Sequence, residues 1–376
     1  MSEQIRHIAP AEFDSLMQLL HASFGAASGF FPREFPHLYQ PDPEACSWAN
    51  VLEADGRFVA HVGVYPLEMR IRGTAMKMGG IGAVGTLPEA RGRHHMSRLL
   101  GRAIEVMREQ GYPASALGGD RLRYGAYGWE QAGLRHPLAF DRRSLDRGKV
   151  EAAPLQEVGP DAALPVIERL YRRQACHVLR PRLPLQVRKQ NRRFWLSDDD
   201  GYAISTGADP NTTQLEELVS ADGREAQMIR GILERAGTKT ATWSLPAADT
   251  ERLARVLPHA CWWGWATDWQ YRLVDLEGVM RCALPMLDER AGPLKDGAAS
   301  LVMREHDRTQ AVTMTVAGGR VEVSAGAGAR ERIELAAMDA ARLAFGGPPP
   351  VPERDVPPIF RVLFPLPVHV PPFDHV

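Results

Sequence analysis

Residues 79–107, GGIGAVGTLPEARGRHHMSRLLGRAIEVM, combine regular glycine spacing, a cluster of arginines and a change of hydrophobic period. The glycines at positions 80, 82 and 85 match G-x-G-x-x-G, the pattern of a dinucleotide-binding turn that leads directly from a strand into a helix. Here the pattern lies inside an expected strand, and the residues TLP at 86–88 separate it from the first helical residue. We therefore predict a glycine-rich strand with a bulge and no dinucleotide-binding loop.

An amphipathic helix is predicted after this strand, because apolar side chains recur at helical spacing. They are Met96, Leu99, Leu100, Ala103, Ile104 and Met107, and Gly111 is a stop signal. Four arginines, Arg91, Arg93, Arg98 and Arg102, accompany the start of the helix. A helix N-terminus has unpaired N–H groups and a partial positive charge, and arginines bind phosphate well. We predict a phosphate or pyrophosphate site at this helix start.

The order of elements predicts a mixed α/β fold. Residues 10–22 have the pattern of an amphipathic helix, and residues 57–86 that of three strands, with a break at Pro66 and a turn at 72–74. A meander before the helix predicts a mixed sheet instead of a doubly wound one. Similar strand and helix patterns recur after about residue 150 and again from 271, where IELAAMDAARLAFGG at 333–347 is predicted to be a helix. We predict three domains, 1–145, 146–270 and 271–376.

Composition argues against several classes of function. The chain has 45 basic and 46 acidic residues, so its net charge of −1 gives no reason to expect nucleic acid or a membrane surface as partner. It has no apolar run of membrane-spanning length and no apolar signal segment near the N-terminus. Four scattered cysteines argue against a disulfide framework, and His94-His95 without further ligands argues against a metal. We expect a cytoplasmic protein without a metal, and we interpret the tryptophans of 261–269 as core or interface.

Two segments carry a family resemblance. VGTLPEARGRHHMSRLL at 84–100 resembles motif A of the GCN5-related N-acetyltransferase (GNAT) superfamily, in which a strand, a glycine- and arginine-containing loop and a helix follow one another. YGAYGWEQAG at 124–133 resembles a second segment of that superfamily. The whole arrangement is similar to the enhanced-intracellular-survival (Eis) type. This resemblance implies two tandem GNAT-like mixed-sheet domains followed by a sterol-carrier-like α/β domain.

The resemblance also implies a co-substrate, acetyl-CoA, and the residues that bind it. Strand residues would pair with its pantetheine arm, and the loop that follows would hold its pyrophosphate. The candidates are Val84, Gly85, Thr86, Arg91, Gly92, Arg93, His94, His95, Met96 and Ser97. The loop glycines of the family would fall at His94 and Met96, so this sequence departs from the pattern there. Gly92 would compensate by shifting the turn.

Catalytic roles follow from the same resemblance. Tyr124 would act as the general acid that protonates the leaving thiolate, and the carboxylate at Val376 would act as base or amine anchor, with Asp374 nearby. Phe30 and Phe31 would form a wall of the acceptor pocket. The implied function is N-acetylation of a primary amine, on a small molecule or a lysine side chain, by a homo-oligomer. Two alternatives remain open: a catalytically inactive acyl-CoA-binding protein and a lipid carrier.

Overall fold

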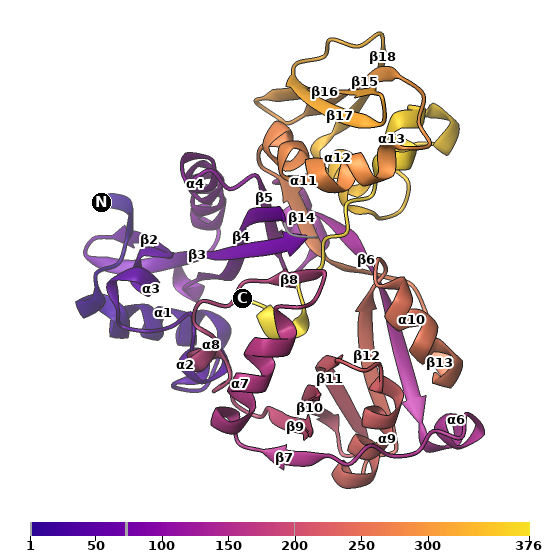
Figure 1. Cartoon of the computed structure of the whole chain (residues 1–376). Helices are drawn as coiled ribbons and strands as arrows, with labels where there is room; N and C mark the ends of the chain where they lie inside the picture. Colours follow the sequence, from indigo (N-terminus) through magenta and orange to yellow (C-terminus); the bar gives the residue numbers. More distant parts are fainter. Residues whose placement is uncertain (1, 72–73, 199) are drawn as a thin grey trace. The chain divides into compact units, whose positions relative to one another are not determined.

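The computed structural model (Figure 1) describes residues 2–71, 74–198 and 200–376. The chain divides into two compact units. Unit 1 contains the residues up to 133, residues 269–366 and Val376. Unit 2 contains residues 134–268 and 367–375. The segment from 271 onward, which we expected to form a third domain, thus groups largely with the N-terminal part of the chain. The boundaries of the three predicted domains remain a prediction.

Unit 1 contains a mixed sheet, as the meander predicted. Its strand order is β1 (Glu3–His7), β2 (Ala49–Ala54), β3 (Arg57–Ile71), β4 (Thr74–Thr86), β5 (Ala114–Leu117) and β14 (Ala266–Leu273). The pairs from β1 to β4 are antiparallel, β4 and β5 are parallel, and β5 and β14 are antiparallel. The parallel pair needs a crossover, which α4 (His95–Glu109) supplies.

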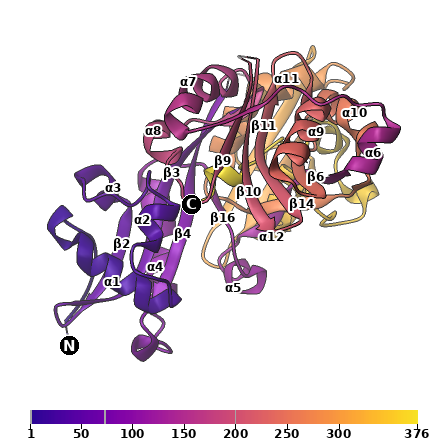
Figure 2. The same cartoon turned by 90° about the horizontal axis from the view of Figure 1, so that it is seen from below.

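Two helices cover this sheet on opposite faces. α1 (Phe13–Phe24) packs against β3 and β4 (Figure 2), and α4 packs against β2, β3 and β4. Neighbouring residues of β2 divide between the two sides, because side chains alternate along a strand: Val51 belongs to the cluster with α1 and Leu52 to the cluster with α4. The short helices α2 (Phe30–Glu34), α3 (Pro43–Ser47) and α5 (Arg121–Gly125) complete this part of unit 1.

Two predictions about strand limits need comment. The expected break at Pro66 is wrong, because β3 runs through it and pairs Pro66 with Gly79. Pairing of β2 with β3 ends at Ala49 and Gly63, so the missing N–H of Pro66 removes no bond between those two strands. The turn predicted at 72–74 involves residues 72 and 73, which lie outside the described residues.

Unit 1 also contains a second sheet, in the order β17 (Arg320–Ala325), β16 (Thr309–Ala317), β15 (Gly297–Arg304) and β18 (Glu331–Ala336). α11 (Leu276–Ala291) packs on β16 and β17 and also on β4, while α12 (Ala337–Phe345) and α13 (Pro358–Leu363) pack near β15. The prediction of one helix over 333–347 is wrong in its first part, where β18 pairs with β15 in parallel. Ile333 and Leu335, two positions apart, are both buried on one side of that strand, which is the period of a strand. Over so short a run, the apolar pattern does not distinguish a strand from a helix.

Unit 2 is built around a second mixed arrangement of strands. Its order is β6 (Glu130–Asp141), β12 (Thr240–Pro246), β11 (Thr212–Ser220), β10 (Gly201–Asp209), β9 (Arg193–Ser197) and β7 (Gln156–Val158). β9, β10 and β11 form an antiparallel meander, α9 (Glu225–Ala236) follows, and β12 is parallel to β11. This repeats the order of meander, helix and parallel strand found in unit 1.

The remaining elements of unit 2 surround these strands. They are α6 (Arg142–Arg147), α7 (Pro160–Tyr171), β8 (Cys176–Val178), α8 (Leu183–Gln186), α10 (Thr250–Val256) and β13 (Trp262–Trp263). Trp262, Trp263 and Trp265 are exposed, which does not fit a core role. Trp269, the first residue of the returning segment of unit 1, is buried.

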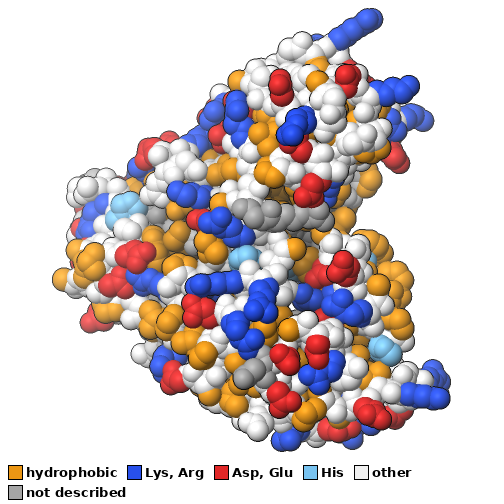
Figure 3. Space-filling view, viewed as in Figure 1, with side chains coloured by type: hydrophobic (Ala, Val, Ile, Leu, Met, Phe, Trp, Pro, Cys, Tyr) orange, Lys and Arg blue, Asp and Glu red, His pale blue; other side chains and the backbone are white. Residues whose placement is uncertain are grey.

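The surface carries both signs of charge. On the face in Figure 3, basic and acidic side chains are interspersed over most of the area. Recognition of an anionic ligand therefore has to come from a local arrangement of groups. Over the described ranges, none of the helices is long and apolar enough to cross a bilayer.

Candidate functional site

β4 contains a bulge near its C-terminal end. Its register with β3 passes from Gly82 opposite Gly63 to Gly85 opposite His61, so two residues, Ala83 and Val84, lie where a regular strand would have one. Ala83 adopts φ 47°, in the left-handed region. The prediction of a glycine-rich strand with a bulge is confirmed, and G-x-G-x-x-G lies within β4.

Each of the three glycines leaves room for another part of unit 1. A Cβ atom on Gly80 would lie 2.8 Å from Cγ2 of Val376, and one on Gly82 would lie 2.9 Å from its carbonyl carbon. A Cβ on Gly85 would lie 3.0 Å from Cβ of Ser23 at the end of α1. These separations are below ordinary van der Waals contact. A side chain at any of the three glycines would therefore clash with Val376 or with the end of α1.

The loop after β4 turns sharply before α4. A short 3₁₀ turn at Pro88–Ala90 follows the strand, Gly92 has φ 78° and His94, the N-cap of α4, has φ 60°. The left-handed backbone at His94 is a conformation in which glycine is unstrained. The His94 side chain makes no capping bond and the first turn has no acidic residue. The N–H groups of that turn are therefore suited to an anion.

The four arginines do not act as one cluster. Arg98 pairs with Glu3, and Arg102 donates to Glu109 at 2.8 Å, so carboxylates occupy both. Arg91 donates to the carbonyl oxygen of Ser23 at 3.2 Å, which ties the loop to the end of α1. Of the four arginines near the helix start, only the two of the loop, Arg91 and Arg93, line the pocket described next.

A pocket of about 680 Å³ lies over this loop and the start of α4. It is lined by all ten residues predicted to bind the co-substrate: Val84, Gly85, Thr86, Arg91, Gly92, Arg93, His94, His95, Met96 and Ser97. Sequence reasoning missed four further lining residues, Ser23, Phe24, Ala90 and Arg123. Three of these lie on α1 and α5, and no motif links them to the loop. The size is ordinary for a cofactor pocket, and its arginines and free helix N-terminus fit a pyrophosphate.

Tyr124 lies on α5, directly after Arg123, which lines the pocket. Its side chain is buried among apolar residues of β2, β3, β4 and α4. Gly119, with φ 145°, makes space for the ring, since a Cβ there would lie 2.6 Å from Cε2 of Tyr124. Burial raises the pKa of Tyr124, and the charge of Arg123 opposes this shift. The phenol is therefore protonated at neutral pH and able to donate a proton.

Val376 packs at the edge of an aromatic cluster in unit 1. Phe31 is at its centre, with its ring centroid 5.3 Å from those of both Phe30 and Tyr39. The hydroxyls of Tyr39 and Tyr65 are 2.6 Å apart, and burial raises the pKa of both phenols. Phe30 and Phe31 thus belong to the same cluster as Val376. Neither they nor Tyr124 line the pocket at the start of α4.

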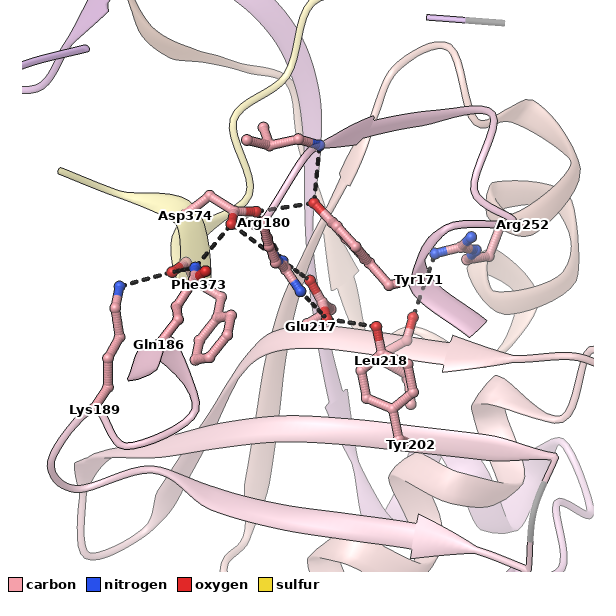
Figure 4. A network of polar contacts seen from close by, with 11 residues as sticks. Tyr171, Arg180, Gln186, Lys189, Tyr202, Glu217, Leu218, Arg252, Phe373 and Asp374 are labelled. Carbon is pink, nitrogen blue, oxygen red and sulfur yellow. Dashed lines mark hydrogen bonds and ion pairs between the residues drawn. The ribbon is translucent and has the colours of Figure 1, made fainter. Parts of the chain in front are cut away.

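Asp374 lies in unit 2, within a buried network (Figure 4). Arg180 donates to it through Nε at 2.7 Å and Nη2 at 2.8 Å, and Tyr171 donates to it at 2.9 Å. Gln186 donates a further bond at 2.9 Å. Burial raises the pKa of Asp374, but the charge and bonds of Arg180 outweigh this and hold it below its usual value. Both carboxylate oxygens, which we expected near the acceptor amine, are engaged in unit 2.

The network extends to Glu217 and to the backbone of Phe373. Arg180 also bonds Glu217, which accepts a bond from Tyr202. Lys189 donates to the carbonyl oxygen of Phe373 at 2.7 Å. One arginine thus faces two buried carboxylates, and both of these have further donors. The network fixes residues 373 and 374 within unit 2.

Residues 4–132 match the family model described as the acetyltransferase (GNAT) domain. A comparison with curated proteins finds no match. Among solved structures, the chain is similar to a GCN5-related N-acetyltransferase from Anabaena variabilis ATCC 29413, with 20% identity, a TM-score of 0.70 and coverage of 92% of this chain and 90% of that one.

Two further structures share the fold. One is a GCN5-related N-acetyltransferase from Kribbella flavida, with 18% identity, a TM-score of 0.66 and coverage of 91% and 88% of the two chains. The other is Eis1 from Mycobacterium abscessus, with 14% identity, a TM-score of 0.64 and coverage of 92% and 90%. The mixed α/β fold is therefore confirmed over most of the chain, and the match to the acetyltransferase (GNAT) family model includes the residues that line the pocket.

Proposed function

We propose that this protein transfers the acetyl group of acetyl-CoA to a primary amine, on a small molecule or a lysine side chain. The observation that supports this most is the pocket at the start of α4, which gathers all ten residues expected to bind the co-substrate. β4 pairs with β5 only as far as Ile81 and Leu117, so Val84, Gly85 and Thr86 extend beyond that pairing. An extended pantetheine arm would bond this strand segment, and the loop N–H groups with Arg91 and Arg93 would hold the pyrophosphate.

The reaction needs two proton movements. The amine nitrogen forms a bond to the acetyl carbon, the carbon–sulfur bond breaks and a thiolate leaves. The nitrogen gives up a proton to a base, and the thiolate takes a proton from an acid. We assign the acid role to Tyr124, whose raised pKa keeps it protonated until the thiolate forms.

We assign the base or amine-anchor role to the carboxylate at Val376. It lies beside Gly82 of β4, two residues before the strand segment proposed to hold the acyl donor. A carboxylate attracts an ammonium group electrostatically. Once the surroundings exclude water, the pKa of the carboxylate rises and it can accept the proton of the amine. Phe30 and Phe31, in the same cluster, would contact the body of the amine.

The rest of the chain has proposed roles too. The repeated order of meander, helix and parallel strand supports unit 2 as a degenerate GNAT-like domain. The second sheet of unit 1, with α11, α12 and α13, would correspond to the sterol-carrier-like domain. The protein would act in the cytoplasm, as a homo-oligomer and without a metal.

Calorimetric titration with acetyl-CoA tests the pocket. We expect saturable binding by the wild type and about tenfold weaker binding by Arg93→Ala, because a charge-assisted bond to phosphate is lost. Arg102→Ala is the matched control, since its guanidinium pairs with carboxylates and does not line the pocket. Absence of binding at millimolar acetyl-CoA would contradict the proposal and favour a lipid carrier.

Thiol release with a panel of amines then tests turnover. Tyr124→Phe should lower kcat by about a hundredfold, the effect of a missing general acid, while its affinity for acetyl-CoA stays near that of the wild type. Addition of two glycines after Val376 should also lower kcat, because the carboxylate is displaced from Gly82. Binding without turnover for every amine would favour the inactive acyl-CoA-binding alternative.

A further inference from the structure

His61 on β3 is a buried histidine that none of the proposed steps uses. Its side chain is fully buried, and Nδ1 lies 2.8 Å from the carbonyl oxygen of Ala83, the left-handed residue of the β4 bulge. A carbonyl oxygen only accepts, so Nδ1 must carry the hydrogen. Burial lowers the pKa of His61 to about 4, so the ring is neutral at pH 7.

The bulge needs such support because its backbone is strained. A left-handed conformation is unfavourable for alanine, and a bulge leaves one residue outside the regular ladder of bonds. The bond from His61 satisfies the carbonyl oxygen of that residue. Nε2 of the same ring is buried and has no hydrogen-bond partner among the described residues, so this single bond is the polar role the ring plays there.

The bulge also determines how the next residues are presented. Pairing of β4 with β5 ends at Ile81, and the residues that line the pocket begin at Val84. An extra residue between these points shifts the alternation of side chains by one position, so the residues after it point to the opposite faces of the sheet. Loss of the bulge would exchange the faces of Val84 and Gly85, which line the pocket.

We propose that His61 is a positioning residue for the co-substrate: its Nδ1–H holds the Ala83 carbonyl and so keeps the β4 bulge in the form that presents Val84 to Thr86 to the acyl donor. This inference rests on the proposed function. It assigns no direct contact between His61 and the co-substrate.

Three variants separate this role from simple core packing. His61→Phe keeps a planar ring but removes the donor, and it leaves the Ala83 carbonyl without a partner. His61→Asn keeps a donor near the position of Nδ1. Ala83→Gly removes the backbone strain, because glycine adopts positive φ freely, and it should make the bulge independent of the histidine.

Calorimetry with acetyl-CoA gives the main measurement, and a urea unfolding curve of each variant confirms that it is folded. We expect His61→Phe to bind about tenfold more weakly, His61→Asn to bind within about threefold of the wild type, and Ala83→Gly to restore most of the affinity when added to His61→Phe. A packing role alone would lower the unfolding midpoint without this pattern of loss and rescue.

The tautomer supplies a readout that does not depend on binding. Nitrogen NMR of the ring should show a proton on Nδ1 and none on Nε2 from pH 5 to 8. The opposite tautomer, or wild-type affinity in His61→Phe, would overturn this inference alone. If the wild type itself does not bind acetyl-CoA, the proposed function fails and this inference with it.

Discussion

Gly92 and Gly101 lie on either side of the start of α4 and differ mainly in backbone conformation. A Cβ atom would meet nothing within 4 Å at either position, but Gly92 has φ 78° whereas Gly101 is inside the helix. Gly92→Ala should lower the free energy of unfolding by about 1 kcal/mol, and Gly101→Ala should raise it by about 0.5–1 kcal/mol. Urea unfolding of both variants checks the opposite signs. Equal shifts would mean that the loop relaxes to another conformation.

His94 should tolerate glycine better than alanine. Its φ of 60° is the conformation in which glycine is unstrained, and histidine is among the residues found there more often than most. We expect His94→Gly to be about 1 kcal/mol more stable than His94→Ala in urea unfolding. If the two variants are equally stable, the left-handed turn at this residue does not persist in solution.

The residues predicted to bind the co-substrate come from two short segments, 84–86 and 91–97, and they line one pocket. The loop from Arg91 to Ser97 follows a strand and starts a helix, and helix geometry alone directs its N–H groups to one place. Arg102 pairs with Glu105 and Glu109 of its own helix. The partner of Arg98, Glu3, is distant in sequence and becomes a neighbour only through the fold. Ser23 and Arg123 were missed for the same reason.

At the scale of elements, the buried network around Arg180 should dominate the electrostatics of unit 2. The Arg180 side chain is 3% exposed, and the side chains of the two carboxylates it faces, Glu217 and Asp374, are 6% and 2% exposed. Arg180→Met should lower the free energy of unfolding by about 3–5 kcal/mol, because the two buried carboxylates lose the positive charge that compensates them. Arg193→Met is the control: its pair with Glu157 is 40% and 46% exposed and should cost less than about 1 kcal/mol.

The same network should give unit 2 an acid-sensitive component. The pKa of Asp374 is lower in the folded protein than its ordinary value of 3.8, so ionised Asp374 stabilises the fold above that value. This contribution should diminish as pH falls below about 4 and vanish below the folded-state pKa. We expect Asp374→Asn to be less stable than the wild type at pH 7, with the difference shrinking as pH falls to 3. A constant difference in thermal midpoint would argue that Asp374 is not ionised in the fold.

Element type could be predicted from sequence wherever one period extends over a long segment. α4 shows its apolar face at helical spacing over three turns, and the structure buries that face. Prediction failed at Pro66 and in the first part of 333–347, where the outcome depends on which strand lies alongside. β18 is a strand because β15 offers it a parallel partner, and the six residues of β18, ERIELA, do not indicate that partner.

At the scale of the whole molecule, the chain passes between its two units four times, at 133/134, 268/269, 366/367 and 375/376. Neither unit is therefore a continuous segment. No composition change marks the crossing at 366, because the surrounding residues are uniformly rich in proline and apolar side chains. The family resemblance implied a role for the last residues in the site, but the sequence could not show that residues 367–375 belong with 134–268.

Phe360 and Phe373 offer a direct test of this assignment. Both side chains are fully buried and they are separated by only 13 positions, but Phe360 lies on α13 in unit 1, whereas Phe373 packs in the cluster of α7, β9 and β10 in unit 2. Replacement of a buried phenylalanine by alanine costs about 3–5 kcal/mol, and proteins open locally near such a cavity.

Amide hydrogen exchange, measured on the full chain, should therefore become faster in a different unit for each of the two variants. Phe373→Ala should speed amide exchange in α7, β9 and β10 and leave β15 and β16 near the wild-type rate. Phe360→Ala should do the reverse, since α13 packs on β15 and α11. If both variants loosen the same elements, the two units open as one cooperative body, and the division of the tail between them has no energetic meaning.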